Sequence, residues 1–182
     1  MRIRPMRRDD VDAVLAIYAE GIEDRLATFE TECPNWSEWD HSHLQQCRLV
    51  AESDGTLIGW AALGPVSSRA CYRGVAEVSF YVARAARGRG VGTTLLEALV
   101  RQSEEAGFWT LQGSTLEENV ASLRVQENCG FRVVGVQERI GRLDGLWKTT
   151  VLTERRSEVV GADGPEGRSA TTSPSQPRQS RA

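Results

Sequence analysis

The hydrophobic residues of the chain form segments that alternate between the period of a strand and the period of a helix. Val11, Leu15 and Tyr18 share one helical face, and Asp9 before them is a favourable N-cap residue. Asp54-Gly55 is a typical hairpin dipeptide between two strand-like runs. The predicted elements, in chain order, are a strand over residues 1–5, helices over 9–20 and 37–46, strands over 49–52, 57–63 and 75–82, a helix over 93–106, a strand over 109–114, a helix over 119–129 and strands over 131–138 and 146–153.

The strand predicted over residues 75–82 carries an acidic residue among apolar ones. One face of this strand is apolar and consists of Ala76, Val78, Phe80 and Val82. Glu77 falls on the other face with Ser79 and Tyr81. A carboxylate in mid-strand is either solvated or held in a functional site. The pattern alone leaves both interpretations open.

Residues 21–32 separate the first two predicted helices and have neither helical nor strict strand periodicity. A stretch of this length inside a compact domain is usually functional, and it carries Phe29 with no pattern that would bury it. We therefore predict a loop that covers a binding site.

The order of the elements predicts the fold class. Strand, two helices, three strands, helix, strand, helix and two strands make an α/β (α+β) domain, in which helices flank a mixed, mostly antiparallel sheet. We place this domain at residues 1–156. Residues 157–182 are rich in Gly, Pro, Ser, Thr and Arg with almost no large apolar residues, so we expect a disordered C-terminal tail.

The composition of the chain argues against several classes of function. The 182 residues are 40% hydrophobic and carry a net charge of −3, which is ordinary for a globular protein and gives no basic footprint for nucleic acid. The four cysteines lack C-x-x-C spacing, so no metal site is predicted. With no leader-like start and no long apolar run, a cytoplasmic protein without membrane contact is expected.

A glycine-rich loop, residues 87–92 (RGRGVG), lies between the strand at 75–82 and the helix at 93–106. Its glycines let the backbone approach a ligand, and the helix start adds unpaired N–H groups and a positive dipole end. A phosphate-bearing ligand is therefore favoured over a plain surface turn. No lysine follows Gly92, which argues against a P-loop, and the glycine spacing differs from the dinucleotide fingerprint.

These motifs resemble the GCN5-related N-acetyltransferases. Arg87, Gly90 and Gly92 match their acyl-coenzyme A loop, Q/R-x-x-G-x-G/A, and residues 119–131 are similar to their second coenzyme A element. Within the superfamily, residues 28–31, 69–72, 76–82 and 145–147 resemble the phosphinothricin acetyltransferases, and residues 21–31 and 141–145 more closely resemble the arsinothricin-resistance branch. The resemblance implies a GNAT fold, acetyl-CoA as co-substrate and acetylation of the α-amino group of a glutamate-like antimetabolite.

The resemblance also implies roles for individual residues. Glu77 matches the catalytic glutamate, and in a partly dry site we expect its pKa to be raised. A backbone N–H near Phe80 to Val82 would meet the oxyanion, and Asn119 would meet the pantetheine arm, cap a helix, or do both. The predicted coenzyme-binding residues are Phe80, Tyr81, Val82, Arg87, Gly88, Arg89, Gly90, Val91, Gly92, Thr93, Asn119 and Ser122.

The predicted substrate-binding residues are Thr28, Phe29, Arg69, Tyr72 and Arg73. The arginines would pair an anionic amino acid through their guanidinium groups. Phe29 would close over the substrate, in this subunit or its partner in a homodimer, or would only pack the core.

One position departs from the resemblance. Where relatives place Tyr or His in the helix after Asn119, this chain has Gln126, which cannot supply a proton at neutral pH but can donate a hydrogen bond. Coenzyme A leaves readily as a thiolate, so we expect weakened but not abolished transfer. The alternatives are acetylation of methionine sulfone, methionine sulfoximine or a protein N-terminus, and a coenzyme A-binding sensor that has lost catalysis.

Overall fold

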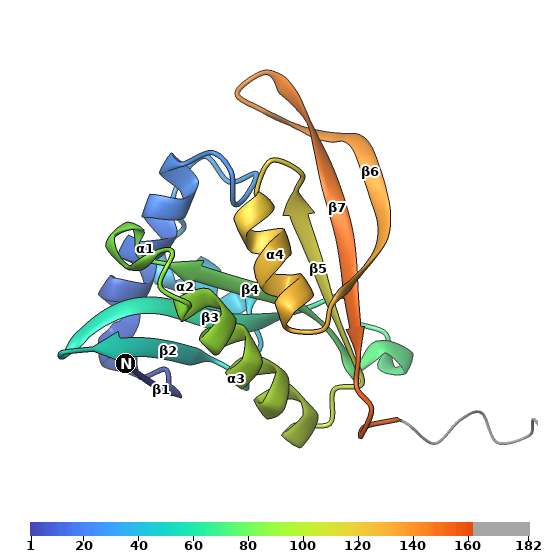
Figure 1. Ribbon diagram of the computed structural model, residues 1–182, viewed down its shortest axis with the longest axis horizontal. Coiled ribbons are helices and arrows are strands. Elements are labelled where there is room, and N and C mark those ends of the chain that lie inside the picture. The colour runs from blue at the N-terminus through green and yellow to red at the C-terminus, as the bar shows by residue number, and fades with distance from the viewer. Residues whose placement is uncertain (162–182) are drawn as a thin grey trace, which may run out of the picture.

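The computed structural model describes residues 1–161, and the predicted order of helices and strands holds within them (Figure 1). The elements are β1 (Arg2–Pro5), α1 (Val11–Glu23), α2 (Trp36–Ser42), β2 (Leu49–Ser53), β3 (Thr56–Pro65), β4 (Val75–Val82), α3 (Val91–Glu105), β5 (Thr110–Leu116), α4 (Val120–Asn128), β6 (Arg132–Leu143) and β7 (Leu146–Arg156), with short 3-10 turns at Arg8–Asp10, Ala70–Tyr72 and Arg84–Ala86.

Several boundaries differ from the prediction. α1 continues to Glu23, so the loop that follows it is shorter than predicted. α2 ends at Ser42 rather than at residue 46, because His43 adopts extended backbone angles. Of the predicted tail, only residues 157–161 are described; there the Ser157 N–H donates to the Trp109 carbonyl at 2.9 Å. The rest of that prediction lies outside the described residues.

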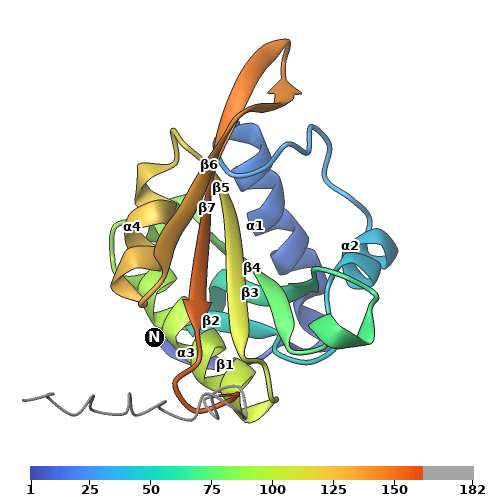
Figure 2. The same ribbon diagram turned by 90° about the vertical axis from the view of Figure 1, so that its right-hand side faces the viewer.

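The strands form one sheet in the order β1-β2-β3-β4-β5-β7-β6. Every neighbouring pair is antiparallel except β4 and β5, which run parallel. The mixed, mostly antiparallel sheet predicted from the sequence is confirmed. The hairpin of β6 and β7 projects beyond the rest of the sheet (Figure 2).

Two hydrophobic layers bury the two faces of the sheet. On one face, α3 packs Leu95, Leu96 and Leu99 against Ala76 and Val78 of β4. This layer matches the predicted apolar face of β4, so Glu77 lies on the other side.

The second layer lies under α1 and α2. Its fully buried members are Val14, Trp39, Val50, Trp60 and Ala62. Figure 2 shows α1 and α2 on one side of the sheet and α4 on the other. None of the helices within residues 1–161 is long and apolar enough to cross a membrane.

Candidate active site

A cleft opens where β4 and β5 separate. The two strands pair from Val75 opposite Thr110 to Glu77 opposite Gln112, and the pairing ends there. β5 continues along β7 as far as Leu116, while β4 continues along β3. The gap between them is a cavity of about 1300 Å³ that is also lined by the loop after α1, the start of α3 and α4. The irregular segment after α1, predicted to cover a binding site, lines this cavity with residues 26–30.

The two ends of the cleft differ in character. We call the part lined by Gly88, Gly90 and the first turn of α3 the coenzyme end, and the part lined by Thr28, Gly64 and Glu77 the substrate end. The coenzyme end offers backbone N–H groups and a helix N-terminus, which favour an anion. The substrate end is walled by the loop after α1 and by the C-terminal end of α2.

Glu77 lies where the two strands part. It occupies the last paired position of β4, and its side chain is open to the cleft rather than packed in a core layer. The surrounding protein removes part of its hydration, and this desolvation raises the pKa of the carboxyl group. The shift agrees with the expectation from the sequence. A carboxylate with a raised pKa is suited to accept a proton.

The glycine loop has a backbone that only glycine adopts readily. Gly88 and Gly90 have φ angles of 72° and 79°, and α3 begins directly afterwards at Val91. The Thr94 N–H donates to the Gly90 carbonyl at 3.0 Å, so the N–H groups before it have no partner inside the helix. These groups line the coenzyme end and can cradle phosphate oxygens.

The two arginines of this loop, Arg87 and Arg89, differ in their contacts. Arg87 donates from Nε to the Val82 carbonyl at 3.0 Å and from Nη1 to Asp24 at 2.5 Å. Burial acts to raise the pKa of Asp24, but hydrogen bonds from Arg84 and Arg87 lower it below its ordinary value. Arg89 is exposed and does not line the cleft. Phosphate binding by this loop would therefore depend on backbone N–H groups, while the Arg87 side chain holds the loop against the C-terminal end of α1.

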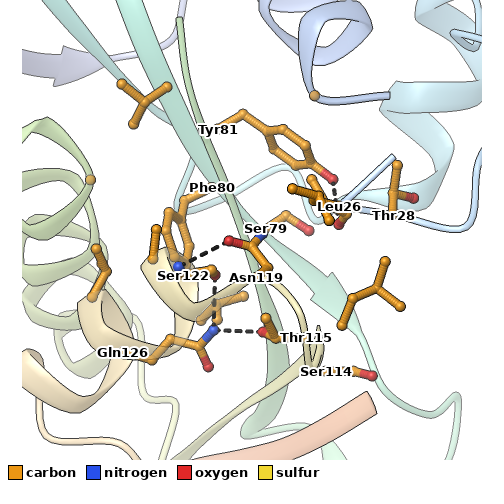
Figure 3. Close-up of a pocket in the computed structure, with 18 of the residues that line it drawn as sticks. Leu26, Thr28, Ser79, Phe80, Tyr81, Ser114, Thr115, Asn119, Ser122 and Gln126 are labelled. Carbon is orange, nitrogen blue, oxygen red and sulfur yellow. Dashed lines mark hydrogen bonds between the residues drawn. The ribbon is translucent and has the colours of Figure 1, made fainter. Parts of the chain in front are cut away.

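Residues of α4 and β5 form a hydrogen-bond chain along the cleft (Figure 3). The Ser122 N–H donates to Asn119 Oδ1 at 3.1 Å, so Asn119 caps α4 as predicted. Gln126 Nε2 donates to Thr115 Oγ1 at 2.7 Å and to Ser122 Oγ at 3.2 Å. Thr153 Oγ1 donates in turn to Gln126 Oε1.

Gln126 is therefore a structural residue. Its side chain is 2% exposed, and both hydrogens of its amide are engaged. A Cβ on Gly113 would lie 2.4 Å from Gln126 Oε1, so the glycine in β5 makes room for this side chain. The Gln126 amide donates hydrogen bonds, as the sequence allowed, but it donates them to Thr115 and Ser122.

The loop after α1 is anchored at both sides. Tyr81 Oη donates to the Ala27 carbonyl at 3.4 Å, and burial raises the pKa of Tyr81 well above its ordinary value, so the phenol stays neutral (Figure 3). The ring of Phe29 rests on β6, where a Cβ at Gly141 would come within 2.7 Å of it. Arg25 pairs with Asp144 at 3.1 Å. Thr28 and Phe29 both line the cleft, and Phe29 packs on the hairpin rather than in the core.

The three remaining predicted substrate residues lie away from this cleft. They belong to the exposed segment before β4, where Arg69 stacks over Tyr72 at 5.8 Å. Arg73 stacks over Trp109, which precedes β5, at 5.5 Å. None of the three lines the cleft of its own chain. The structure thus places Thr28 and Phe29 in the cleft that Glu77 lines but leaves Arg69, Tyr72 and Arg73 outside it.

Sequence reasoning missed two residues of the substrate end. Tyr18 was assigned only to the packing face of α1, and His43 was given no role, yet both line the cleft. His43 lies there because α2 ends early and its last turn crosses Gly64. Gly64-Pro65 was the available signal, since a glycine opposite a mid-strand carboxylate leaves room on that face.

The residues of the cleft fit a long thioester ligand with a phosphate-bearing end. Backbone donors at Gly88 to Thr93 would meet the phosphates, the unpaired edge of β4 beyond Glu77 would follow an extended arm, and Glu77 would lie near the thioester. Such a ligand supplies an activated acyl group. The protein then has to place a nucleophile beside it and accept that nucleophile's proton.

Comparison with known proteins agrees with a cleft for an acyl thioester. Residues 13–131 match the family described as "Acetyltransferase (GNAT) family". The chain is 36% identical over 163 residues to the phosphinothricin N-acetyltransferase of Alcaligenes faecalis, covering 84% of this chain and 81% of that one. It is 28% identical to the L-methionine sulfoximine/L-methionine sulfone acetyltransferase of Salmonella typhimurium, covering 81% and 89%. It superposes on the crystal structure of a phosphinothricin acetyltransferase from Sinorhizobium meliloti in complex with AcCoA with a TM-score of 0.80 and 25% identity, covering 93% and 95%.

Proposed function

Because the chain belongs to the acetyltransferase (GNAT) family and is an acetyl-CoA-dependent N-acetyltransferase, we propose that it acetylates the α-amino group of a small glutamate-like amino acid such as phosphinothricin or arsinothricin. The observation that carries this proposal is the shape of the substrate end. Glu77 lines it, and the anchored loop at Thr28 and Phe29 forms one of its walls, which suits a small amine better than a protein terminus.

The proposed roles follow from the contacts. Glu77 accepts a proton from the amine, directly or through a water, since its raised pKa brings it nearer to that of the nitrogen it serves. The backbone of Phe80 to Val82, where β4 has left β5, meets the oxyanion. Acetyl-CoA supplies the activated acetyl group. Gln126 holds α4 against β5 and takes no part in proton transfer.

Coenzyme binding is proposed for the glycine loop and the start of α4. The N–H groups of Gly88 to Thr93 bind the pyrophosphate, and Asn119 contributes to the pantetheine site while it caps α4. Arg87 contributes through its backbone, and Arg89 only through long-range charge.

The anionic groups of the substrate need cations that this cleft does not supply. Within the described residues, the arginines that line it are Arg87 of the glycine loop and Arg124 of α4, and neither lies on the segments that wall the substrate end. We therefore propose that the chain acts as a homodimer and that Arg69, Tyr72 and Arg73 serve the site of the partner subunit. Exposed apolar side chains on the projecting hairpin, such as Val136 and Trp147, support an assembly of two copies.

A second candidate is a substrate with less negative charge. Methionine sulfoximine and methionine sulfone carry a single carboxylate and no acidic side chain, and a curated relative is named for acetylating them. The lack of cations at the substrate end favours this alternative if the chain acts as a monomer. A coenzyme-binding sensor is the least supported alternative, because Glu77 and its opening are both in place.

The experiment that tests the proposal is thiol release from acetyl-CoA in the presence of L-phosphinothricin, L-arsinothricin, L-methionine sulfoximine, L-methionine sulfone or a short peptide. Light scattering on the same sample gives the oligomeric state. The proposal predicts a kcat/KM for phosphinothricin or arsinothricin at least tenfold above that for the others, in a dimer. A preference for the two methionine derivatives would show that the substrate is one of them and not phosphinothricin or arsinothricin. Binding of acetyl-CoA without turnover on any amine would favour the sensor.

A further inference from the structure

His43 is an ionisable side chain at the substrate end of the cleft. Gly64 is the direct partner of Glu77 in the pairing of β3 with β4, and a Cβ built on Gly64 would lie 3.4 Å from the Ser42 carbonyl oxygen. The end of α2 therefore lies over the position next to Glu77. His43 follows Ser42, and it lines the cleft together with Gly64 and Glu77.

The hydrogen bonds of the imidazole assign its tautomer. His43 Nδ1 lies 2.8 Å from the carbonyl oxygen of Trp39, which can only accept, so Nδ1 carries the hydrogen. The Ser42 hydroxyl donates to the same carbonyl at 2.9 Å, which leaves an oxygen lone pair toward Nδ1. In the neutral ring, Nε2 then has no hydrogen and is a hydrogen-bond and proton acceptor.

Packing keeps this ring neutral and fixed. It stacks on Trp39 with the ring centroids 4.1 Å apart and meets the edge of Trp60 at 5.8 Å. Burial lowers the pKa of His43 below its ordinary value. The charged groups that act on the ring are Arg48, whose guanidinium donates to the His43 carbonyl at 2.8 Å, and Asp40 on α2. Glu77 lines the same cleft.

Acetyl transfer to an amino acid releases two protons from one nitrogen. The amine arrives as an ammonium with three hydrogens; a C–N bond forms, the thioester C–S bond breaks, the sulfur leaves as a thiolate, and the amide keeps one hydrogen. Glu77 can take one of the two protons. A second acceptor beside it spares the enzyme an exchange with bulk water in the middle of the reaction.

We propose that His43 Nε2 is the second proton acceptor for the substrate nitrogen, acting beside Glu77. The proton that it takes up passes to water through the open cleft, which restores the neutral ring. This role depends on the acetyl transfer itself and not on which amino acid is acetylated.

The kinetic test compares the wild type with His43→Gln and His43→Ala, and uses the exposed His41→Gln as the matched control. Whichever of L-phosphinothricin and L-methionine sulfoximine has the higher wild-type kcat/KM serves as substrate. We expect kcat to fall about 10²-fold in both His43 variants, with KM nearly unchanged, and added imidazole to restore much of the activity of His43→Ala. A kcat unchanged in His43→Gln, or a loss that imidazole does not reverse, would overturn the proposal.

A second measurement needs no substrate. Long-range ¹H–¹⁵N NMR of the two histidines, assigned with His41→Gln, reports which ring nitrogen is protonated at pH 7. The proposal requires hydrogen on Nδ1 of His43 and none on Nε2, and the opposite tautomer would refute it. If the wild type acetylated neither amino acid, the proposed substrates would be wrong, and the tautomer would still decide whether Nε2 can accept a proton.

Discussion

Replacing Gln126 by leucine separates a structural role from a catalytic one. Leucine has nearly the same volume but can form none of the three side-chain hydrogen bonds that Gln126 makes with Thr115, Ser122 and Thr153. The hydroxyls of Thr115 and Thr153 belong to residues only 8% and 4% exposed, so water replaces the lost partner poorly. Two buried bonds at about 1–1.5 kcal/mol each give an expected loss of about 2–3 kcal/mol in the free energy of unfolding.

Urea unfolding followed by tryptophan fluorescence measures this loss, with the exposed Gln46→Leu as a control that should change stability by less than about 0.5 kcal/mol. The kcat of the folded Gln126→Leu enzyme should stay within about threefold of the wild type, since no proton or donor is removed from the reaction. Unchanged stability together with a kcat lowered about a hundredfold or more would refute this reasoning. It would instead make the amide a donor to the leaving sulfur.

Three further substitutions test other parts of the structure. Gly90→Ala forces a side chain onto a φ of 79° and should cost about 1 kcal/mol and raise the KM for acetyl-CoA; an unchanged KM would argue against the loop as the phosphate site. Arg4→Met leaves the carboxylate of Asp10 buried without its partner and should destabilise the fold by about 3 kcal/mol at pH 7. Hydrogen bonding from Arg4 lowers the pKa of Asp10, so the wild type should be more stable than Arg4→Met to urea at neutral pH, and this difference in the free energy of unfolding should vanish as the pH falls through that lowered pKa. A difference in stability that stays constant with pH would contradict this role of Arg4. Gly141→Ala places a Cβ 2.7 Å from the ring of Phe29 and should raise the KM for the amino acid but not for acetyl-CoA, and equal changes in both would refute a local effect.

The regular elements could be predicted because each follows from local periodicity. The apolar face of β4, Ala76 with Val78, fixed which side Glu77 faces, and the glycine loop before α3 marked the coenzyme end. The loop after α1 was predicted from the absence of any period. These are signals within a few residues of each other, which a sequence displays directly.

The missed features depend on contacts between distant segments. Nothing near Gln126 indicates that its amide would be used by Thr115 and Thr153, because β5 and β7 meet α4 only in the folded chain. His43 enters the cleft through the docking of α2 over Gly64. Arg69 was placed by resemblance to relatives, and its distance from the cleft of its own chain could not be read from a linear motif.

The most direct test of the central claim is the rate of acetyl-CoA consumption with L-phosphinothricin by the wild type and by Glu77→Gln, measured across pH. The account predicts that the substitution lowers kcat by about 10²–10³-fold while acetyl-CoA still binds. It also predicts that wild-type activity declines on the acid side at a pH above the ordinary carboxyl pKa, because desolvation raises the pKa of Glu77 and the protonated form cannot accept the amine's proton. A Glu77→Gln enzyme that keeps the wild-type kcat and pH profile would contradict the assignment of this cleft as the site of acetyl transfer.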